Sequence, residues 1–191
     1  MEIRRALTIL CVGLLFGCAG THPSGHLGPS EEAVGYYKEG VSLSKEGRSE
    51  EALSLLKKAV RIYPDYGDAY YNMGILYLGQ GQLQEAAEAY TRAIEINPGD
   101  AAAHMNLGNI YMRQGRLSAA IHELEEAVKL DPAYGLAHHN LALAYYLARM
   151  YHRAWDHLDR LERLGIPPDP SLRDAVAGAL HPGGGGPGDK E

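Results

Sequence analysis

Between residues 33 and 168 the apolar positions follow two periods at once. Within short stretches they recur every three to four residues, which is the spacing that places side chains on one face of an α-helix. The whole arrangement then repeats every 34 residues, and Pro64, Pro98 and Pro132 mark this interval near the ends of three successive units. The pattern divides the region into repeats at 33–66, 67–100, 101–134 and, more loosely, 135–168. Each repeat is predicted to form two helices joined by a turn.

Small residues recur at fixed places in these repeats. Positions 8 and 20 hold only glycine or alanine: Gly40, Gly74, Gly108 and Ala142 at the first, and Ala52, Ala86, Ala120 and Ala154 at the second. Side chains of this size let two helices approach closely. Between the predicted helices of the first three repeats stand Gly47, Gly81 and Gly115, which can adopt the left-handed conformation that ends a helix. The pattern therefore predicts tightly packed helical hairpins.

This 34-residue pattern resembles the tetratricopeptide repeat, over about residues 33–168. The resemblance implies an all-α fold, an α-solenoid of about four helix-turn-helix repeats (residues 31–168) plus a C-terminal capping helix. The fourth repeat departs from the pattern at Arg149, Leu161 and Ile166, as expected of a terminal repeat without a successor. Residues 169–181 are predicted to form the capping helix with Ser171 as its N-cap, and the Gly-rich tail 182–191 is predicted to be disordered.

The N-terminal 30 residues differ from the repeats. A basic start precedes an apolar run over residues 6–16, which has the length of a signal-peptide core and is too short to span a bilayer. The sequence LFGC at 15–18 resembles the lipobox of bacterial lipoproteins, which implies a signal peptide over 1–17 and acylation of Cys18. Residues 18–30 would then form the lipidated cysteine and a flexible tether. An ordinary signal peptide and an uncleaved anchor are the alternatives.

The composition of the chain argues against several classes of function. The formal net charge of −6 gives no sign of a basic surface for nucleic acid. Both cysteines, Cys11 and Cys18, fall in the first 18 residues, so the repeats hold no disulfide, thiol nucleophile or cysteine metal ligand. The nine histidines include no pair at i and i+4 with a third ligand nearby. Since no catalytic motif is present either, we expect no enzyme activity, no metal and no cofactor.

The resemblance also implies a binding surface, because the first helix of each repeat lines the concave side in this family. Read onto this sequence, the family's groove positions give an apolar and aromatic surface with asparagines through it: Tyr37, Tyr71, Asn72, Ile75, Met105, Asn106, Asn109, His139, Asn140 and Leu143. An Asn amide can hydrogen-bond the backbone of an extended peptide, although asparagine is also common in the family consensus at position 6. Positions 2 and 5 carry no Lys or Arg, which argues against capture of an acidic C-terminal tail.

These features predict a membrane-anchored scaffold or adaptor of the bacterial cell envelope, which binds a helix or extended peptide of one or more envelope proteins in its groove. Ala19 after the cysteine implies a periplasm-facing position on the outer membrane, if sorting follows the enterobacterial rule. Similar lipoproteins act in pilus and secretin assembly, in the regulation of peptidoglycan enzymes and in outer-membrane assembly. The alternative from another class is a self-associating structural envelope protein, a homo-oligomer.

Overall fold

A computed structural model describes residues 28–181, and this range is helical without strands. It contains nine α-helices: α1 (Glu31–Lys45), α2 (Ser49–Ile62), α3 (Gly67–Gly79), α4 (Leu83–Ile96), α5 (Ala101–Arg113), α6 (Leu117–Leu130), α7 (Gly135–Leu147), α8 (Tyr151–Arg163) and α9 (Pro170–Leu180). None of these helices is both long enough and apolar enough to cross a membrane. The predicted signal peptide, Cys18 with most of the tether, and the tail 182–191 lie outside the described residues.

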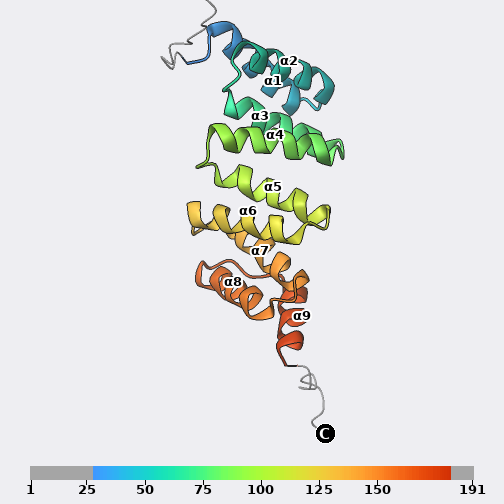
Figure 1. The fold of residues 1–191 in the computed structure, drawn as a ribbon, viewed down its shortest axis with the longest axis vertical. Coiled ribbons are helices and arrows are strands. Elements are labelled where there is room, and N and C mark those ends of the chain that lie inside the picture. Colours follow the sequence, from blue (N-terminus) through green and yellow to red (C-terminus); the bar gives the residue numbers. More distant parts are fainter. Residues whose placement is uncertain (1–27, 182–191) are drawn as a thin grey trace, which may run out of the picture.

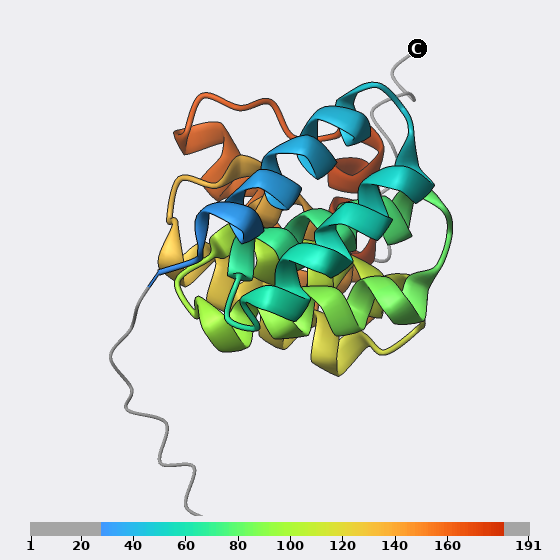
Figure 2. The same ribbon diagram turned by 90° about the horizontal axis from the view of Figure 1, so that it is seen from above.

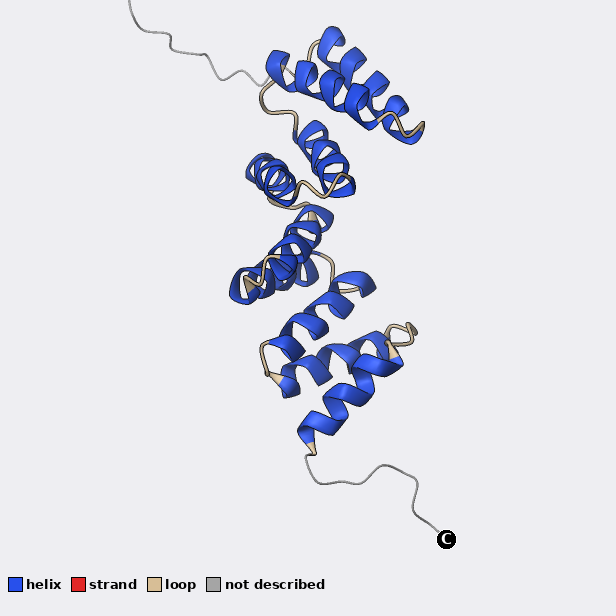
Figure 3. Ribbon diagram, turned by 90° about the vertical axis from the view of Figure 1, so that its right-hand side faces the viewer, coloured by secondary structure: helices blue, strands red, loops and turns tan. Residues whose placement is uncertain are grey.

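The first eight helices pair into four hairpins that stack on one another (Figure 1). Within the hairpins α1 packs on α2, α3 on α4, α5 on α6 and α7 on α8, and the second helix of each hairpin also packs on the first helix of the next. Figure 2, viewed along the stack, shows the hairpins lying over one another, and Figure 3 shows that their direction changes from one to the next. The arrangement confirms the predicted all-α solenoid of four repeats with a capping helix.

A left-handed residue ends the first helix of every hairpin. Gly47, Gly81 and Gly115 have φ of 80°, 75° and 72°, and the fourth hairpin places Arg149 in the same conformation at φ 60°. In each hairpin the next backbone N–H donates back to a carbonyl five residues earlier, for example from Gln82 to Tyr77 at 2.9 Å. This closes the helix end in a Schellman motif, for which glycine carries no steric cost. The sequence therefore predicted the turn glycines correctly.

Close packing explains the small residue at position 8. A Cβ added at Gly74 would lie 2.8 Å from the Tyr90 ring, and one added at Gly108 would lie 2.7 Å from Cγ of Leu124. Those two neighbours belong to the second helix of the same hairpin and are completely buried. Since real side chains do not approach so closely, the second helix would have to move away to accept an alanine.

The capping helix α9 closes the end of the stack against α8. Its buried residues Leu172 and Val176 join the core cluster that also contains Leu158 and Leu161 of α8. The predicted N-cap was wrong, because the helix begins two residues after Pro168 and the cap is Asp169, whose Oδ1 accepts a hydrogen bond from the Leu172 N–H at 2.8 Å. A proline at the first helical position needs no partner for a backbone N–H, and it thereby favours this earlier start.

Candidate functional site

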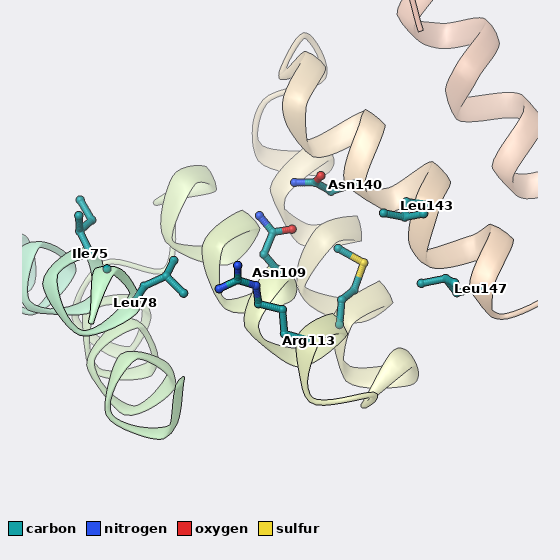
Figure 4. Close-up of a pocket in the computed structure, with 9 residues that line it drawn as sticks. Ile75, Leu78, Asn109, Arg113, Asn140, Leu143 and Leu147 are labelled. Atoms are coloured by element: carbon teal, nitrogen blue, oxygen red, sulfur yellow. The ribbon is translucent and has the colours of Figure 1, made fainter. Parts of the chain in front are cut away.

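The first helices of repeats two, three and four surround a hollow on one face of the stack, with a volume of about 680 Å³ (Figure 4). Its lining comes from α3, α5 and α7 in equal parts: Ile75, Leu78 and Gly79, then Asn109, Met112 and Arg113, then Asn140, Leu143 and Leu147. The helices α3 and α5 contribute positions 9, 12 and 13 of their repeats, and α7 contributes positions 6, 9 and 13. The hollow thus lies on the face where the family resemblance places the binding groove, and we call these nine residues the groove.

The groove is mainly apolar and two of its large side chains are open to solvent. Ile75 is 43% exposed and Leu147 is 49% exposed. The polar members are two asparagine amides and one guanidinium, that of Arg113. An apolar hollow with a few polar groups is the usual character of a surface that binds another molecule.

The asparagines at position 6 bond to the preceding repeat. Nδ2 of Asn72 donates to the hydroxyl oxygen of Tyr37 at 3.4 Å, and Nδ2 of Asn106 donates to that of Tyr71 at 3.3 Å. Nδ2 of Asn140 approaches Sδ of Met105 at 3.4 Å, which is a weaker acceptor. Each pair is separated by 35 residues, so the column joins successive first helices. The amide groups are therefore partly occupied before any ligand arrives.

The structure brings together only part of the predicted groove set. Ile75, Asn109, Asn140 and Leu143 line the groove. Four others, Tyr71, Asn72, Asn106 and His139, lie on the same three helices outside the lining, and Tyr37 lies on α1. Met105 is only 5% exposed and belongs to the core instead. The groove adds Leu78, Gly79, Met112, Arg113 and Leu147, all at positions 12 and 13 of their repeats. The recurrence of positions 12 and 13 every 34 residues was the sequence signal that could have identified these five residues.

Two buried histidines occupy position 4 and have different partners. Nδ1 of His104 lies 2.7 Å from a carboxylate oxygen of Glu123, and this hydrogen bond raises the pKa of His104. His138 instead meets His157, with the two Nδ1 atoms 2.9 Å apart, and burial lowers the pKa of His138. Burial, together with the charge that His138 would carry, lowers the pKa of His157 to about 4.

Both histidines are also tied to the loop that precedes their helix. Nε2 of His104 lies 3.3 Å from the carbonyl oxygen of Pro98, and Nε2 of His138 lies 3.1 Å from that of Pro132. The part of the chain that the structure describes holds no group of three or more His, Cys, Asp or Glu side chains arranged for a metal ion. Each histidine thus joins its helix both to the second helix of its own hairpin and to the end of the preceding repeat.

Comparison with known families and structures gives a consistent result. A family model for the tetratricopeptide repeat matches residues 37–101, 71–135 and 105–167. No curated protein matches the chain. Among solved structures, a crystal structure of MamA superposes with a TM-score of 0.67 at 26% identity, over 70% of this chain and 78% of the other.

Two further structures resemble the stack. YrrB, a TPR protein with an unusual peptide-binding site, gives a TM-score of 0.64 at 26% identity, over 78% of this chain and 73% of the other. The first TPR of Spaghetti (RPAP3), bound to the HSP90 peptide SRMEEVD, gives a TM-score of 0.60 at 19% identity, over 62% and 94%. At this last identity the likeness concerns the fold alone.

Proposed function

The chain belongs to the tetratricopeptide repeat family, and we propose that it is a scaffold whose groove on α3, α5 and α7 binds a segment of a partner protein. The observation that carries the proposal is the apolar hollow with Ile75 and Leu147 exposed at its surface. YrrB, which is similar over most of both chains, is a TPR protein with a peptide-binding site and supports the same class of activity.

Apolar contact supplies most of the affinity in this proposal. Each 100 Å² of apolar surface removed from water contributes roughly 2.5 kcal/mol before the costs of association. Asn140 contributes mainly through Oδ1, since its Nδ2 already lies 3.4 Å from Met105. An amide oxygen accepts a hydrogen bond from the backbone N–H of a bound segment irrespective of that segment's sequence. The groove therefore selects by shape and apolar character, with the asparagine as an adaptable contact.

The proposed setting is the surface of a bacterial envelope membrane. It rests on the resemblance of LFGC at 15–18 to a lipobox, and a lipid on Cys18 would hold the solenoid within a short tether of the bilayer. Anchoring raises the local concentration of the groove near a membrane-bound partner, and this increases apparent affinity without new contacts. The partner would be an envelope protein, and the outer membrane is the compartment that Ala19 favours.

In-cell crosslinking followed by mass spectrometry tests the groove. The double variant Ile75→Glu and Leu147→Glu places two charges in the apolar hollow at side chains that are already exposed, so the fold tolerates them. The matched control is Ile62→Glu, because Ile62 is 40% exposed and lies outside the groove. We expect one envelope protein to be captured by the wild type and the control and lost with the double variant.

Two other results would contradict the proposal. Capture of the same proteins by all three chains would mean that the groove is not the binding site. Capture of a second copy of this chain alone, lost with the double variant, would support the self-associating structural protein instead.

The anchor has a separate test. With Cys18→Ala we expect loss of metabolic labelling by a radioactive fatty acid. A labelled Cys18→Ala protein would refute lipidation at this residue and would leave the groove proposal untouched.

A further inference from the structure

Arg113 differs from the rest of the groove because it is the charged member of an otherwise neutral lining. It stands in the last turn of α5, and Figure 4 shows its side chain projecting from α5 on the side that faces Leu78 of α3. The equivalent position 13 is Lys45 in the first repeat, which lies outside the groove, Gly79 in the second and Leu147 in the fourth. Among the three repeats that line the groove, only the third therefore places a cation in it.

No carboxylate in residues 28–181 pairs with Arg113. Several arginines on or beside the second helices have acidic partners, for example Arg48 with Glu51 and Arg163 with Asp159. The helices around the groove offer no such partner, because α5 and α7 contain no Asp or Glu and α3 contains only Asp68, in its first turn. Arg113 belongs to the last turn of its helix, so Asp68 lies at the other end of the first-helix layer.

We infer that Arg113 selects the occupant of the groove, which is an apolar segment of a partner protein that carries one carboxylate. This inference rests on the proposed peptide-binding function and adds the chemistry of the ligand. A guanidinium can donate two parallel hydrogen bonds to one carboxylate, and the apolar walls exclude water from the pair once the segment is bound. A segment with several charges fits poorly, since the lining has no other charged group to meet them and an unpaired buried charge is costly.

The experiment begins with peptides selected from a random 12-residue display library on the full-length chain held in mild detergent. A selected peptide is synthesised with its acidic residue, with the matching amide, and with its C-terminus free or amidated. Affinities are measured by calorimetry for the wild type, Arg113→Gln and Arg113→Glu. The matched control is Lys45→Gln, since Lys45 holds position 13 of the first repeat and lies outside the groove.

We expect selected peptides to contain apolar residues and one acid, and affinity to fall roughly three- to ten-fold with Arg113→Gln and further with Arg113→Glu. The same loss of affinity should follow when the acidic residue of the peptide is replaced by its amide. In Arg113→Gln, this replacement in the peptide should leave the affinity unchanged. A peptide in which acid is replaced by lysine should regain affinity for Arg113→Glu. If amidation of the C-terminus removes the effect, the carboxylate is that of the chain end, and otherwise it is a side chain.

Failure of the inference on Arg113 can be distinguished from failure of the proposed groove function. Peptides that bind the wild type and all Arg113 variants equally, yet lose affinity with Ile75→Glu and Leu147→Glu, overturn the role of Arg113 and leave the groove function standing. The absence of any peptide whose affinity depends on Ile75 and Leu147 overturns both.

Discussion

Tyr90 fills the position that leucine holds in the other three repeats, and its hydroxyl has no partner. Leu56, Leu124 and Leu158 stand at the equivalent place, and all four side chains are essentially inaccessible to solvent. The Tyr90 ring fits because Gly74 leaves room for it and because the Tyr71 ring packs edge-on at 5.6 Å. Its hydroxyl is buried without a hydrogen bond in the structure, which is an energetic cost.

Tyr90→Phe should therefore stabilise the protein by about 1 kcal/mol, because it removes an unsatisfied buried hydroxyl and keeps the ring. The measurement is the free energy of unfolding in urea, followed by circular dichroism. Tyr71→Phe is the control, since the Tyr71 hydroxyl accepts a hydrogen bond from Asn106 and its loss should cost about 0.5–1 kcal/mol. A destabilised Tyr90→Phe protein would show that the hydroxyl does have a partner.

Gly108→Ala should destabilise the protein by roughly 1–3 kcal/mol, because the new methyl group would overlap Leu124 on the facing helix. The same urea titration measures it. Gly35→Ala in α1 is the matched control, since nothing lies within 4 Å of the added Cβ and alanine is favoured in helices by up to about 1 kcal/mol. Equal effects of the two substitutions would mean that helix spacing does not depend on position 8.

At the scale of elements, the third and fourth hairpins each join their two helices through a buried histidine, and the two histidines differ in their response to pH. In the third hairpin, Glu123 stabilises the protonated form of His104. In the fourth, each of His138 and His157 would repel the other if both were charged, and Nε2 of His138 also faces the carbonyl oxygen of Pro132. The nearby charged groups are Asp131 and Arg160 around His138, and Asp156 and Glu125 around His157.

Acidification from pH 7 to pH 5 should therefore act on the two hairpins in opposite directions. The folded pKa of His157 is about 4, below the unfolded value of about 6.5, so the unfolded chain binds more protons in this interval. The contribution of His157 to stability therefore decreases as the pH is lowered. The pKa of His104 is raised, so its contribution is complete at low pH and is lost as pH rises through the folded value.

Urea unfolding at pH 7 and pH 5 measures this difference in two variants. His157→Gln should reduce the acid loss of stability, and His104→Gln should increase it. If both substitutions change the pH dependence in the same direction, the assignment of partners to these histidines is wrong.

At the scale of the whole molecule, charge is separated between the two sets of helices. The first helices of repeats two to four contain only Asp68 and Arg113 as Asp, Glu, Lys or Arg, whereas their partner helices α4, α6 and α8 together carry nine Asp and Glu residues. Stacking buries one side of each of these first helices and leaves its other side in the groove. The groove is thus a mainly apolar surface with one positive charge, that of Arg113, on a protein with net charge −6, and this suits an apolar ligand.

Removal of α9 by a stop after residue 168 should loosen the fourth hairpin and leave the first two unchanged. Each hairpin contacts mainly its neighbours, so loss of the buried Leu172 and Val176 is felt chiefly by α7 and α8. Hydrogen exchange should show amide protection in α8 falling by roughly ten-fold or more, with α1–α4 within error. A stop after residue 181 is the control. A uniform loss across all helices would show that the stack unfolds as one unit.

Much of the fold could be predicted because it rests on local signals. The 34-residue period gave the hairpins, the glycines at the turns gave the ends of the first helices, and the small residues at positions 8 and 20 indicated close helix contact. The groove was predicted less well. Ile75, Asn109, Asn140 and Leu143 line it, whereas Arg113 and Leu147 were missed.

The sequence by itself determined the register of the repeats, since turn glycines, helix-ending prolines and apolar spacing act within a few residues of one another. Only the tertiary structure decided that Met105 is buried and that Asn72 and Asn106 bond to tyrosines 35 residues earlier. These features depend on the rotation of one hairpin against the next. That rotation is set by the summed packing of α2 to α8, and no single segment of the sequence encodes it.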